Sequence, residues 1–522
     1  MQKVKIYDTT LRDGSQGEGI SFSVLDKLRI TEKMDKIGVD YIEGGWPGSN
    51  PKDMEFFIKV AKKDLKHARV CAFSMTRRPG AKASEDPSLK ALFKSKVGIV
   101  TIVGKTWDFH VEEVLKTTLE ENLAMIRDTI AFLKSQGLSV FYDAEHFFDA
   151  YKANKNYALA TLIAACEAGA EAICLCDTNG GALTSEITEV IKQVKEKVDS
   201  PLGIHCHNDS GVAIANSIAA VQAGAVLVQG TVNGIGERCG NADLIPVIAN
   251  LQLKLKINCI PEKNLKELIH LSHFISEISN MRVKSDQPFV GDSAFAHKGG
   301  MHINAIMKNP RTYEHVDPAA VGNRRRILMS ELGGKTGILM RAKGLNFDLS
   351  KDDPQTRKIL KLLQGLEHQG YQFEAAEASF QLLMQRVLKK YKEFFELEGF
   401  KVVIEKVSDK KITTEAVIKL KVKGKREHTA AEGDGPVNAL DNALRKALKD
   451  FYPTLSKMQL SDFKVRVLDE QAGTAAKVRV LIQSQDESDT WSTIGVHENI
   501  IEASWQALVD SVEYKLLKDK QP

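Results

Sequence analysis

The chain has 522 residues, of which 43% are hydrophobic and 27% charged, and its formal net charge is +4. This length predicts two or three domains, and so small a net charge gives no reason to expect a nucleic-acid partner. No run of about 18 apolar residues occurs, so the sequence predicts no membrane-spanning helix. Seven cysteines without a CxxC pair, and no apolar leader before the first strand, predict a cytoplasmic protein without a disulfide framework or structural zinc knuckle.

Short apolar runs and helical segments alternate along the first 255 residues. The runs have the composition of strands and lie at 4–7, 39–43, 69–73, 97–103, 138–142, 171–175, 202–206 and 225–232. Between them, segments with helical spacing lie at 23–37, 53–63, 109–135, 155–168, 184–198 and 211–222. Eight such alternations predict an α/β fold, a closed (β/α)8 TIM barrel, over residues 1–275. A doubly wound parallel sheet is the alternative.

The pattern changes twice after the barrel. Residues 276–395 are helical and irregular, which predicts linker subdomains. Within residues 396–522, "TAAEGDGPVNALDNAL" (429–444) aligns with "TIGVHENIIEASWQAL" (493–508) at an offset of 64 residues. Each copy has the pattern strand, strand, strand, helix. This predicts an α+β C-terminal domain with an internal βββα repeat, suited to regulation or dimerisation.

Polar residues follow nearly every predicted strand, at the end of a barrel where catalytic residues lie. The sharpest cluster is "HCHND" at 205–209. Because strand residues two apart point to the same side, His205 and His207 both face inward and can share a divalent ion. Asp13, in the loop after the first strand, is the best third ligand, and Asn241 offers a further oxygen. An ion that keeps coordination positions open for substrate is catalytic rather than structural.

Three motifs together resemble one enzyme family. "DTTLRDGSQ" (8–16), "HCHND" (205–209) and "NGIGERCGN" (233–241) are similar to motifs of the isopropylmalate, homocitrate and citramalate synthases, in the same order. The third motif does not fit the GxGxxG pattern of a dinucleotide site. "HKGGMH" (297–302) resembles the family's linker motif, and "EGDGPVNAL" (432–440) resembles part of its regulatory domain. The resemblance therefore covers essentially the whole chain.

The resemblance implies a metal-dependent barrel enzyme that condenses acetyl-CoA with a 2-oxo acid. The metal ligands that it implies are Asp13, His205, His207 and Asn241. Arg12 is similar to the arginine that steadies the keto oxygen, Glu145 to a catalytic glutamate beside the substrate, and Thr178 to the threonine that binds the substrate carboxylate. His302 resembles the linker histidine, which in this family reaches the barrel of a neighbouring subunit and so implies a homodimer.

Two positions depart from the family pattern. The aspartate that usually follows the linker histidine by two places is Asn304 here. Basic residues occupy the stretch "VGNRRR" (321–326), where some relatives carry a catalytic tyrosine, and Tyr313 is only a loose substitute. Neither role is therefore transferred to this chain.

The chemistry of a 2-oxo acid supports the interpretation. A divalent ion (Mn²⁺, Zn²⁺, Mg²⁺ or Co²⁺) acts as a Lewis acid on the ketone, and Arg12 stabilises the alkoxide that develops. A base must also take a proton from the acetyl methyl group, and the sequence does not choose between His302 and Glu145. Simpler alternatives stay open: Glu145 paired with Lys105, His302 without a role, and Thr178 as a helix cap.

The choice of 2-oxo acid is predicted from two further stretches. "EGGWPGSNPKD" (43–53) and "YDAEHFFDAYKAN" (142–154) resemble the branch of the family that uses pyruvate. We therefore expect acetyl-CoA and pyruvate to give (R)-citramalate and CoA on a route to isoleucine, with feedback inhibition by an amino acid. The alternative substrate is 2-oxoisovalerate, which gives 2-isopropylmalate for leucine. The sequence also leaves open a hydroxymethylglutaryl-CoA type lyase that uses Cys239, and a non-enzymatic amino-acid sensor.

Overall fold

The computed structural model divides the chain into two compact units. The residues that it describes are 3–282, 284–328, 338–339, 342, 349–350, 352–408, 411–468 and 475–519. The first unit comprises Met1–Phe295 with His315–Arg325, and the second comprises Ala296–Glu314 with Arg326–Pro522. The domain boundaries proposed at 275 and 395 stay predictions. Among the described residues, no helix is both long and apolar enough to span a membrane.

The first unit is built on a closed barrel of eight parallel strands, as predicted. The strands are β1 (Lys5–Asp8), β2 (Tyr41–Gly45), β3 (Arg69–Met75), β4 (Ile99–Lys105), β5 (Ser139–Glu145), β6 (Ala172–Asp177), β7 (Leu202–Cys206) and β8 (Leu227–Gly230). Each strand pairs with its neighbour in sequence, and β1 closes the barrel on β8 with Lys5 opposite Leu227. The doubly wound alternative is therefore wrong.

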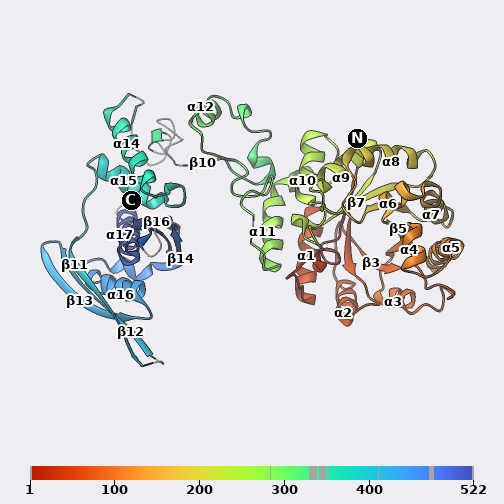
Figure 1. The fold of residues 1–522 in the computed structure, drawn as a ribbon, viewed down its shortest axis with the longest axis horizontal. Coiled ribbons are helices and arrows are strands. Elements are labelled where there is room, and N and C mark those ends of the chain that lie inside the picture. Colours follow the sequence, from red (N-terminus) through yellow and green to blue (C-terminus); the bar gives the residue numbers. More distant parts are fainter. Residues whose placement is uncertain are drawn as a thin grey trace. The chain divides into compact units, whose positions relative to one another are not determined.

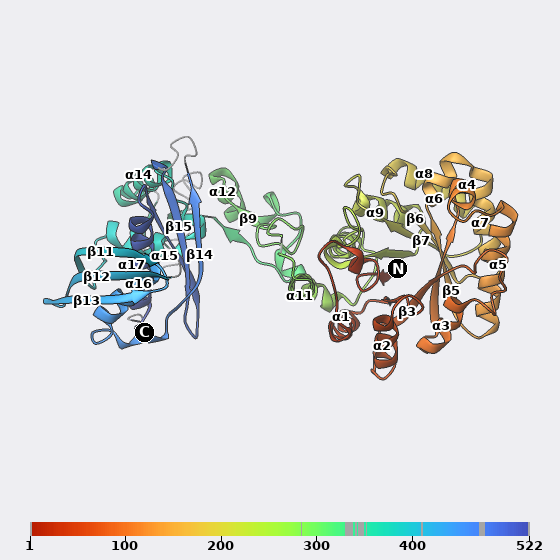
Figure 2. The same cartoon turned by 60° about the horizontal axis from the view of Figure 1, so that its bottom comes forward.

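Helices surround the strands (Figures 1 and 2). They are α1 (Val24–Ile37), α2 (Pro51–Val60), α3 (Pro87–Ser95), α4 (Asp108–Glu113), α5 (Leu119–Ser135), α6 (Phe147–Ala153), α7 (Lys155–Glu167), α8 (Thr184–Lys195), α9 (Ala213–Ala223), α10 (Leu244–Ala249) and α11 (Leu268–Ile278). Local sequence sets their ends. Ser23 and Asp26 form a capping box at the start of α1, and Gly38, at φ 95°, ends that helix in a left-handed conformation that glycine adopts without strain.

The predicted single helix at 109–135 is two helices. Lys116 has a left-handed φ of 54°, and the Thr118 hydroxyl accepts a hydrogen bond from the Glu121 backbone, which starts α5 at Leu119. Helices α3 and α6 were not predicted from the sequence. The start of α3 carries a recognisable signal, because Asp86 caps the helix and Pro87 occupies its first position.

The barrel interior is apolar at one end and polar at the other. Tyr7, Tyr41, Phe141 and neighbouring side chains form a separate buried layer inside the strands. Above that layer the Tyr7 hydroxyl lies 2.9 Å from a Glu43 carboxylate oxygen, and Glu43 is fully buried. The buried polar groups thus begin in the middle of the barrel and continue towards the carboxyl ends of the strands.

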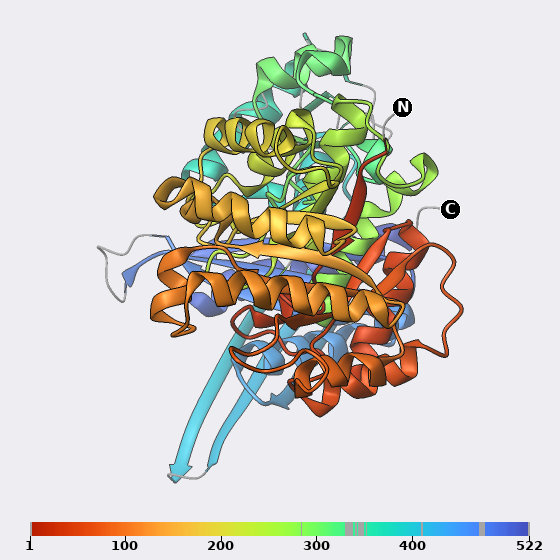
Figure 3. The ribbon, with the colours of Figure 1, turned by 90° about the vertical axis from the view of Figure 1, so that its right-hand side faces the viewer.

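The second unit contains two copies of one βββα motif, which confirms the predicted repeat. The first copy is β11 (Glu396–Ser408), β12 (Lys411–Val422), β13 (Lys425–Gly433) and α16 (Pro436–Leu448). The second is β14 (Gln459–Val467), β15 (Val478–Gln485), β16 (Thr490–His497) and α17 (Ile500–Lys518). Each motif forms an antiparallel three-stranded sheet, and β11 and β12 extend as a long hairpin (Figure 3, cyan).

Shorter elements precede the repeat in the second unit. They are the two-stranded pair β9 (Ala296–His297) and β10 (Arg326–Ile327), and the helices α12 (Gly300–Lys308), α14 (Pro354–His368) and α15 (Glu377–Val387). Helix α16 packs on β12 and β13, and α17 packs on β15 and β16. The rings of Phe400 and Trp505 meet at 5.3 Å, so the two copies share one core.

Two neighbouring residues of α2 test the packing between helix and barrel. Phe57 is fully buried in the core, whereas Ile58 is 47% exposed on the same helix. Phe57→Ala should lower the free energy of unfolding by about 3–5 kcal/mol, because it leaves a cavity. Ile58→Ala should change it by less than about 1 kcal/mol. Urea denaturation measures both, and equal losses would contradict this packing.

Candidate metal centre at the barrel mouth

Closure of the barrel brings one carboxylate and two imidazoles together. Asp13 follows β1, while His205 and His207 lie at the end of β7. The Asp13 Oδ2 atom is 3.3 Å from His205 Nε2 and 3.7 Å from His207 Nε2. All three side chains are buried, and one ligand atom from each lies within 4.8 Å of the others. The predicted convergence of Asp13 with the histidine pair is therefore present in the fold.

A hydrogen-bonded chain orients the first imidazole. His205 Nδ1 lies 2.9 Å from Gln229 Oε1, and Gln229 Nε2 donates to Asp143 Oδ1 at 2.8 Å. Because the amide oxygen is an acceptor, His205 carries a proton on Nδ1, which leaves Nε2, on the side of Asp13, as the atom that can bind a metal ion. Such outer partners fix the ring and tautomer of a metal-binding histidine. Gln229 was not predicted from the sequence, although its inward position in the last predicted strand was a usable signal.

The surrounding charges and burial favour the protonation states in which Asp13 and His207 can bind a metal ion. Burial opposes ionisation of Asp13, but Arg12 and the two imidazoles hold the pKa of Asp13 well below its usual range. Burial and the neighbouring His205 lower the pKa of His207 to about 4, so this imidazole is neutral near pH 7. Burial also opposes protonation of His205, yet contact with Asp13 raises the pKa of His205. A bound cation would replace that proton.

Asn241 supplies an oxygen with no partner among the described residues. It lies opposite His207 in an isolated β-bridge, and its Oδ1 atom is buried without a hydrogen bond. Gly236 makes room for this side chain, since a Cβ atom at Gly236 would lie 2.2 Å from Asn241 Nδ2. A carboxylate, two imidazoles and an amide oxygen suit a divalent cation such as Zn²⁺, Mn²⁺ or Co²⁺. The residues therefore fit the predicted metal.

Arg12 is held rigidly beside this cluster. Its Nε donates to Glu43 Oε2 at 2.6 Å, and its guanidinium stacks on the Phe73 ring at 4.1 Å. Its Nη1 lies 3.9 Å from Asp13 Oδ2. The Arg12–Glu43 pair continues the polar column that begins at Tyr7. These contacts of Arg12 were not predicted from the sequence, because Arg12 follows β1 whereas Glu43 lies on β2 and Phe73 on β3.

Glu145 ends β5 and Thr178 follows β6 at the same mouth of the barrel. Glu145 forms an ion pair with Lys105, so the simple pairing considered from the sequence does occur. The Thr178 hydroxyl oxygen accepts a hydrogen bond of 2.9 Å from the His146 backbone. Helix α8 begins only at Thr184 and has Leu183 at its N-cap. The helix-cap alternative for Thr178 is therefore wrong.

A cavity of about 330 Å³ opens over these groups. Six of the predicted site residues line it: Arg12, Asp13, Glu145, Thr178, His205 and His207. Its lining also includes the apolar side chains Trp46, Phe73 and Met75. His302 belongs to the second unit, where its ring stacks on Tyr313 at 4.0 Å. The barrel thus assembles every predicted site residue except the linker histidine.

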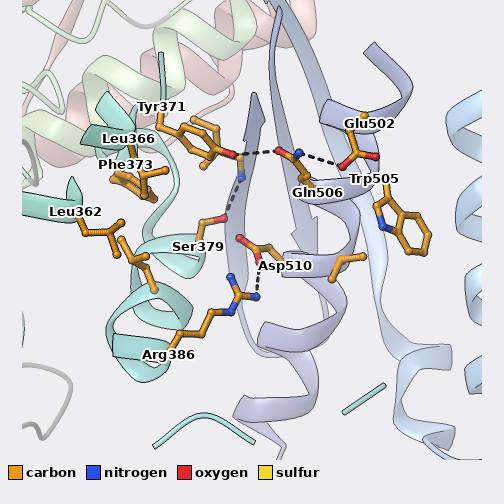
Figure 4. A pocket seen from close by; sticks show the side chains of 13 residues that line it. Leu362, Leu366, Tyr371, Phe373, Ser379, Arg386, Glu502, Trp505, Gln506 and Asp510 are labelled. Atoms are coloured by element: carbon orange, nitrogen blue, oxygen red, sulfur yellow. Dashed lines mark hydrogen bonds and ion pairs between the residues drawn. The ribbon is translucent and has the colours of Figure 1, made fainter. Parts of the chain in front are cut away.

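A second cavity, of about 450 Å³, lies within the second unit (Figure 4). Leucine and phenylalanine side chains of α14 and the segment before α15 face α17 across it. Arg386 donates to Asp510 at 2.9 Å, and the Tyr371 hydroxyl donates to Gln506 at 3.0 Å. None of these residues was singled out from the sequence. The lining combines apolar walls with charged groups, which suits a small ligand that carries both.

Three family models match successive parts of the chain. The first, described as HMGL-like, matches residues 3–275. The second, a homocitrate synthase post-HMGL domain-like model, matches residues 289–370. The third, the LeuA allosteric (dimerisation) domain, matches residues 374–516. This last match associates the repeat with dimerisation and allosteric regulation.

Curated relatives match the whole chain. A protein named (R)-citramalate synthase from Geobacter sulfurreducens is 54% identical over 100% of this chain and 99% of its own length. Proteins of the same name from Aquifex aeolicus and Synechocystis sp. are 53% and 50% identical, over 100% and 98% of this chain and 99% and 96% of their own lengths. The likeness therefore includes the barrel, the linker and the repeat together.

Loss of the carboxylate tests whether the cluster binds a cation. Asp13→Ala should weaken Mn²⁺ binding at least about 100-fold, because Asp13 is the anionic member of the set. Asp149→Asn is the matched control: Asp149 accepts from Asn179 at 2.9 Å on the rim and lies outside the cluster. Titration of Mn²⁺ followed by electron paramagnetic resonance measures both affinities. Unchanged affinity in Asp13→Ala would show that the cluster is not the binding site.

Proposed function

Because the chain belongs to the (R)-citramalate synthase family, we propose that it condenses acetyl-CoA with pyruvate and that water then hydrolyses the resulting thioester, which gives (R)-citramalate and CoA. It is an acyltransferase of the condensing type, and the motif-based expectation of this family is confirmed. The full-length match to synthases disfavours the isopropylmalate, lyase and sensor alternatives. The single observation that carries the mechanism is the convergence of Asp13, His205 and His207 beside Arg12.

Four residues of the barrel would hold a divalent ion: Asp13, His205, His207 and Asn241. The ion would supply Lewis-acid polarisation of the ketone of pyruvate. Gln229 and Asp143 keep the His205 ring in place through their hydrogen bonds. The four side chains are buried, and Asp13, His205 and His207 line the mouth cavity, through which substrate and the hydrolytic water can enter.

Arg12 has the position and rigidity to stabilise negative charge on the ketone oxygen. Glu43 and Phe73 fix the guanidinium before substrate arrives, so little reorganisation is needed as charge develops. Preorganised donors of this kind usually make the largest catalytic contribution. Thr178 can bind the substrate carboxylate, because its oxygen already accepts from His146 and its proton is left to donate.

Two groups are proposed for the proton of the acetyl methyl group. Glu145 lines the mouth cavity, and its pairing with Lys105 keeps it oriented. His302 comes from the second unit and would act on the barrel of a neighbouring subunit in a homodimer. Both roles stay predictions.

The apolar side chains of the cavity support pyruvate as the 2-oxo acid. Trp46 and Phe73 meet edge to face at 5.7 Å, and Met75 lines the same cavity. These bulky groups leave room for a methyl group more readily than for a branched chain. The second unit, by its family match, is proposed as the dimerisation and feedback module that responds to an amino acid.

Substrate preference tests the proposed reaction. The chain should use pyruvate with a kcat/KM at least about 10-fold higher than 2-oxoisovalerate, because each added methyl group is worth about 1–3 kcal/mol in such a pocket. Thiol release from acetyl-CoA measures both rates. Faster turnover of 2-oxoisovalerate would instead support isopropylmalate synthesis.

The arginine tests the proposed charge stabilisation. Arg12→Lys should lower kcat by about 100-fold or more, because lysine cannot keep both the Glu43 bond and the stacking on Phe73. Arg77→Lys is the control, since Arg77 pairs with Glu121 and Asp128 outside the cavity. Steady-state kinetics compares the two variants, and a similar small effect in both would remove Arg12 from the mechanism.

Feedback tests the role assigned to the second unit. Isoleucine should lower the rate of the full-length chain, because it is the end product of the expected pathway. The effect should occur at concentrations that leave thiol detection unaffected. Inhibition should also appear as weaker binding of substrate or a lower kcat in the kinetic analysis. If isoleucine, leucine and valine all leave the rate unchanged, the repeat has no feedback role.

A further inference from the structure

A second group of potential metal ligands lies inside the barrel, and its two thiols have no part in the proposed reaction. Asp143 on β5 is the direct register partner of Cys174 on the neighbouring strand β6. Cys176 lies two residues further along β6 and therefore points to the same side as Cys174. One ligand atom from each of the three residues lies within 4.8 Å of the others. Strand pairing alone thus places one carboxyl and two thiols around one point.

All three groups are buried at the inner end of the mouth cavity. All three side chains are at most 5% exposed, and both cysteines are free. Burial raises the pKa of the Asp143 carboxyl to about 7. Burial also raises the pKa of the Cys174 thiol well above its usual value. The thiols are therefore held neutral, and a cation would supply the charge that stabilises their ionised forms.

The chemistry of the cluster differs from that of the first site. Two thiols select soft or borderline cations such as Zn²⁺ and Cd²⁺, whereas a set of carboxylate, imidazoles and amide oxygen also accepts harder ions. Three protein ligands would leave a further position open. Binding would release both thiol protons to solvent.

An entry path exists from the mouth of the barrel. Asp143 and Cys176 both line the 330 Å³ cavity that also contains Asp13, His205 and His207. On the other side, Phe141 and Ala172 belong to the apolar layer that closes the barrel interior. An ion reaching the thiols would therefore share one cavity with an ion at the first site.

We propose that Asp143, Cys174 and Cys176 form a second cation site, selective for soft divalent ions, whose occupation inhibits the enzyme. The inhibition arises through the first site. Asp143 anchors Gln229, and Gln229 holds the His205 ring, so a cation that captures Asp143 disturbs that histidine.

Thiolate absorption tests the binding. Cd²⁺ is titrated into full-length protein carrying Cys166→Ser and Cys239→Ser, which remove the two thiols that are not buried. With excess Mn²⁺ present to fill the first site, we expect an ultraviolet thiolate-to-Cd²⁺ charge-transfer band that saturates near one equivalent. Adding Cys174→Ser or Cys176→Ser should weaken the binding about 10-fold or more. Cys71→Ser, a buried barrel cysteine outside the cluster, should leave the band unchanged. A parent protein without the band overturns the proposal without relying on any variant.

Kinetics tests the inhibition. The chain with its native cysteines and its Cys174→Ser/Cys176→Ser variant are assayed in excess Mn²⁺, each relative to its own rate without Cd²⁺. Inhibition by Cd²⁺ should require about 10-fold more of the ion in the variant. Equal sensitivity would mean that Cd²⁺ acts by displacing the ion of the first site, and would overturn the inhibitory role. Circular dichroism verifies that the variant is folded.

Discussion

Closure of the barrel is the constraint on which the rest of the structure depends. The pairing of β1 with β8, including Asp8 opposite Gly230, joins the first strand of the chain to the last of the barrel. It brings the loop that carries Asp13 next to the end of β7, so that residues almost two hundred positions apart in sequence meet within 4 Å. A sheet left open at this seam would keep Arg12 and Asp13 apart from the two imidazoles, and neither group alone could perform the proposed chemistry.

A second constraint runs along the inside of the barrel. The Tyr7 hydroxyl meets Glu43 and Thr101, and Glu43 in turn holds Arg12. Burying a charge costs free energy unless the charge is paired. This column can exist because each member forms a hydrogen bond with the next. The same arrangement fixes the guanidinium at the mouth. The fold thereby uses buried polar groups to set the position of Arg12, the proposed catalytic side chain.

The features that could be predicted from the sequence are those that repeat with a fixed period or follow the end of a strand. The eight strands, the βββα repeat and the inward direction of His205 and His207 all come from such patterns. The partners that tune the site were not predictable, because they depend on contacts across several strands: Gln229 behind His205 is one case, and Phe73 under Arg12 is another. Helix α6 was missed because it begins directly after β5 at the left-handed residue His146, which carries no usual capping signal. The role proposed for His302 would depend on assembly between subunits, which no local pattern encodes.

The central claim is that two imidazoles of one strand end and a carboxylate from the first loop bind a single divalent cation. Electron spin-echo modulation of the Mn²⁺-loaded chain tests it most directly, because the method detects nitrogen atoms bonded to the ion. The account predicts couplings from two imidazole nitrogens, with one of them lost in His207→Ala. A spectrum without nitrogen couplings, or one that His207→Ala leaves unchanged, would contradict it.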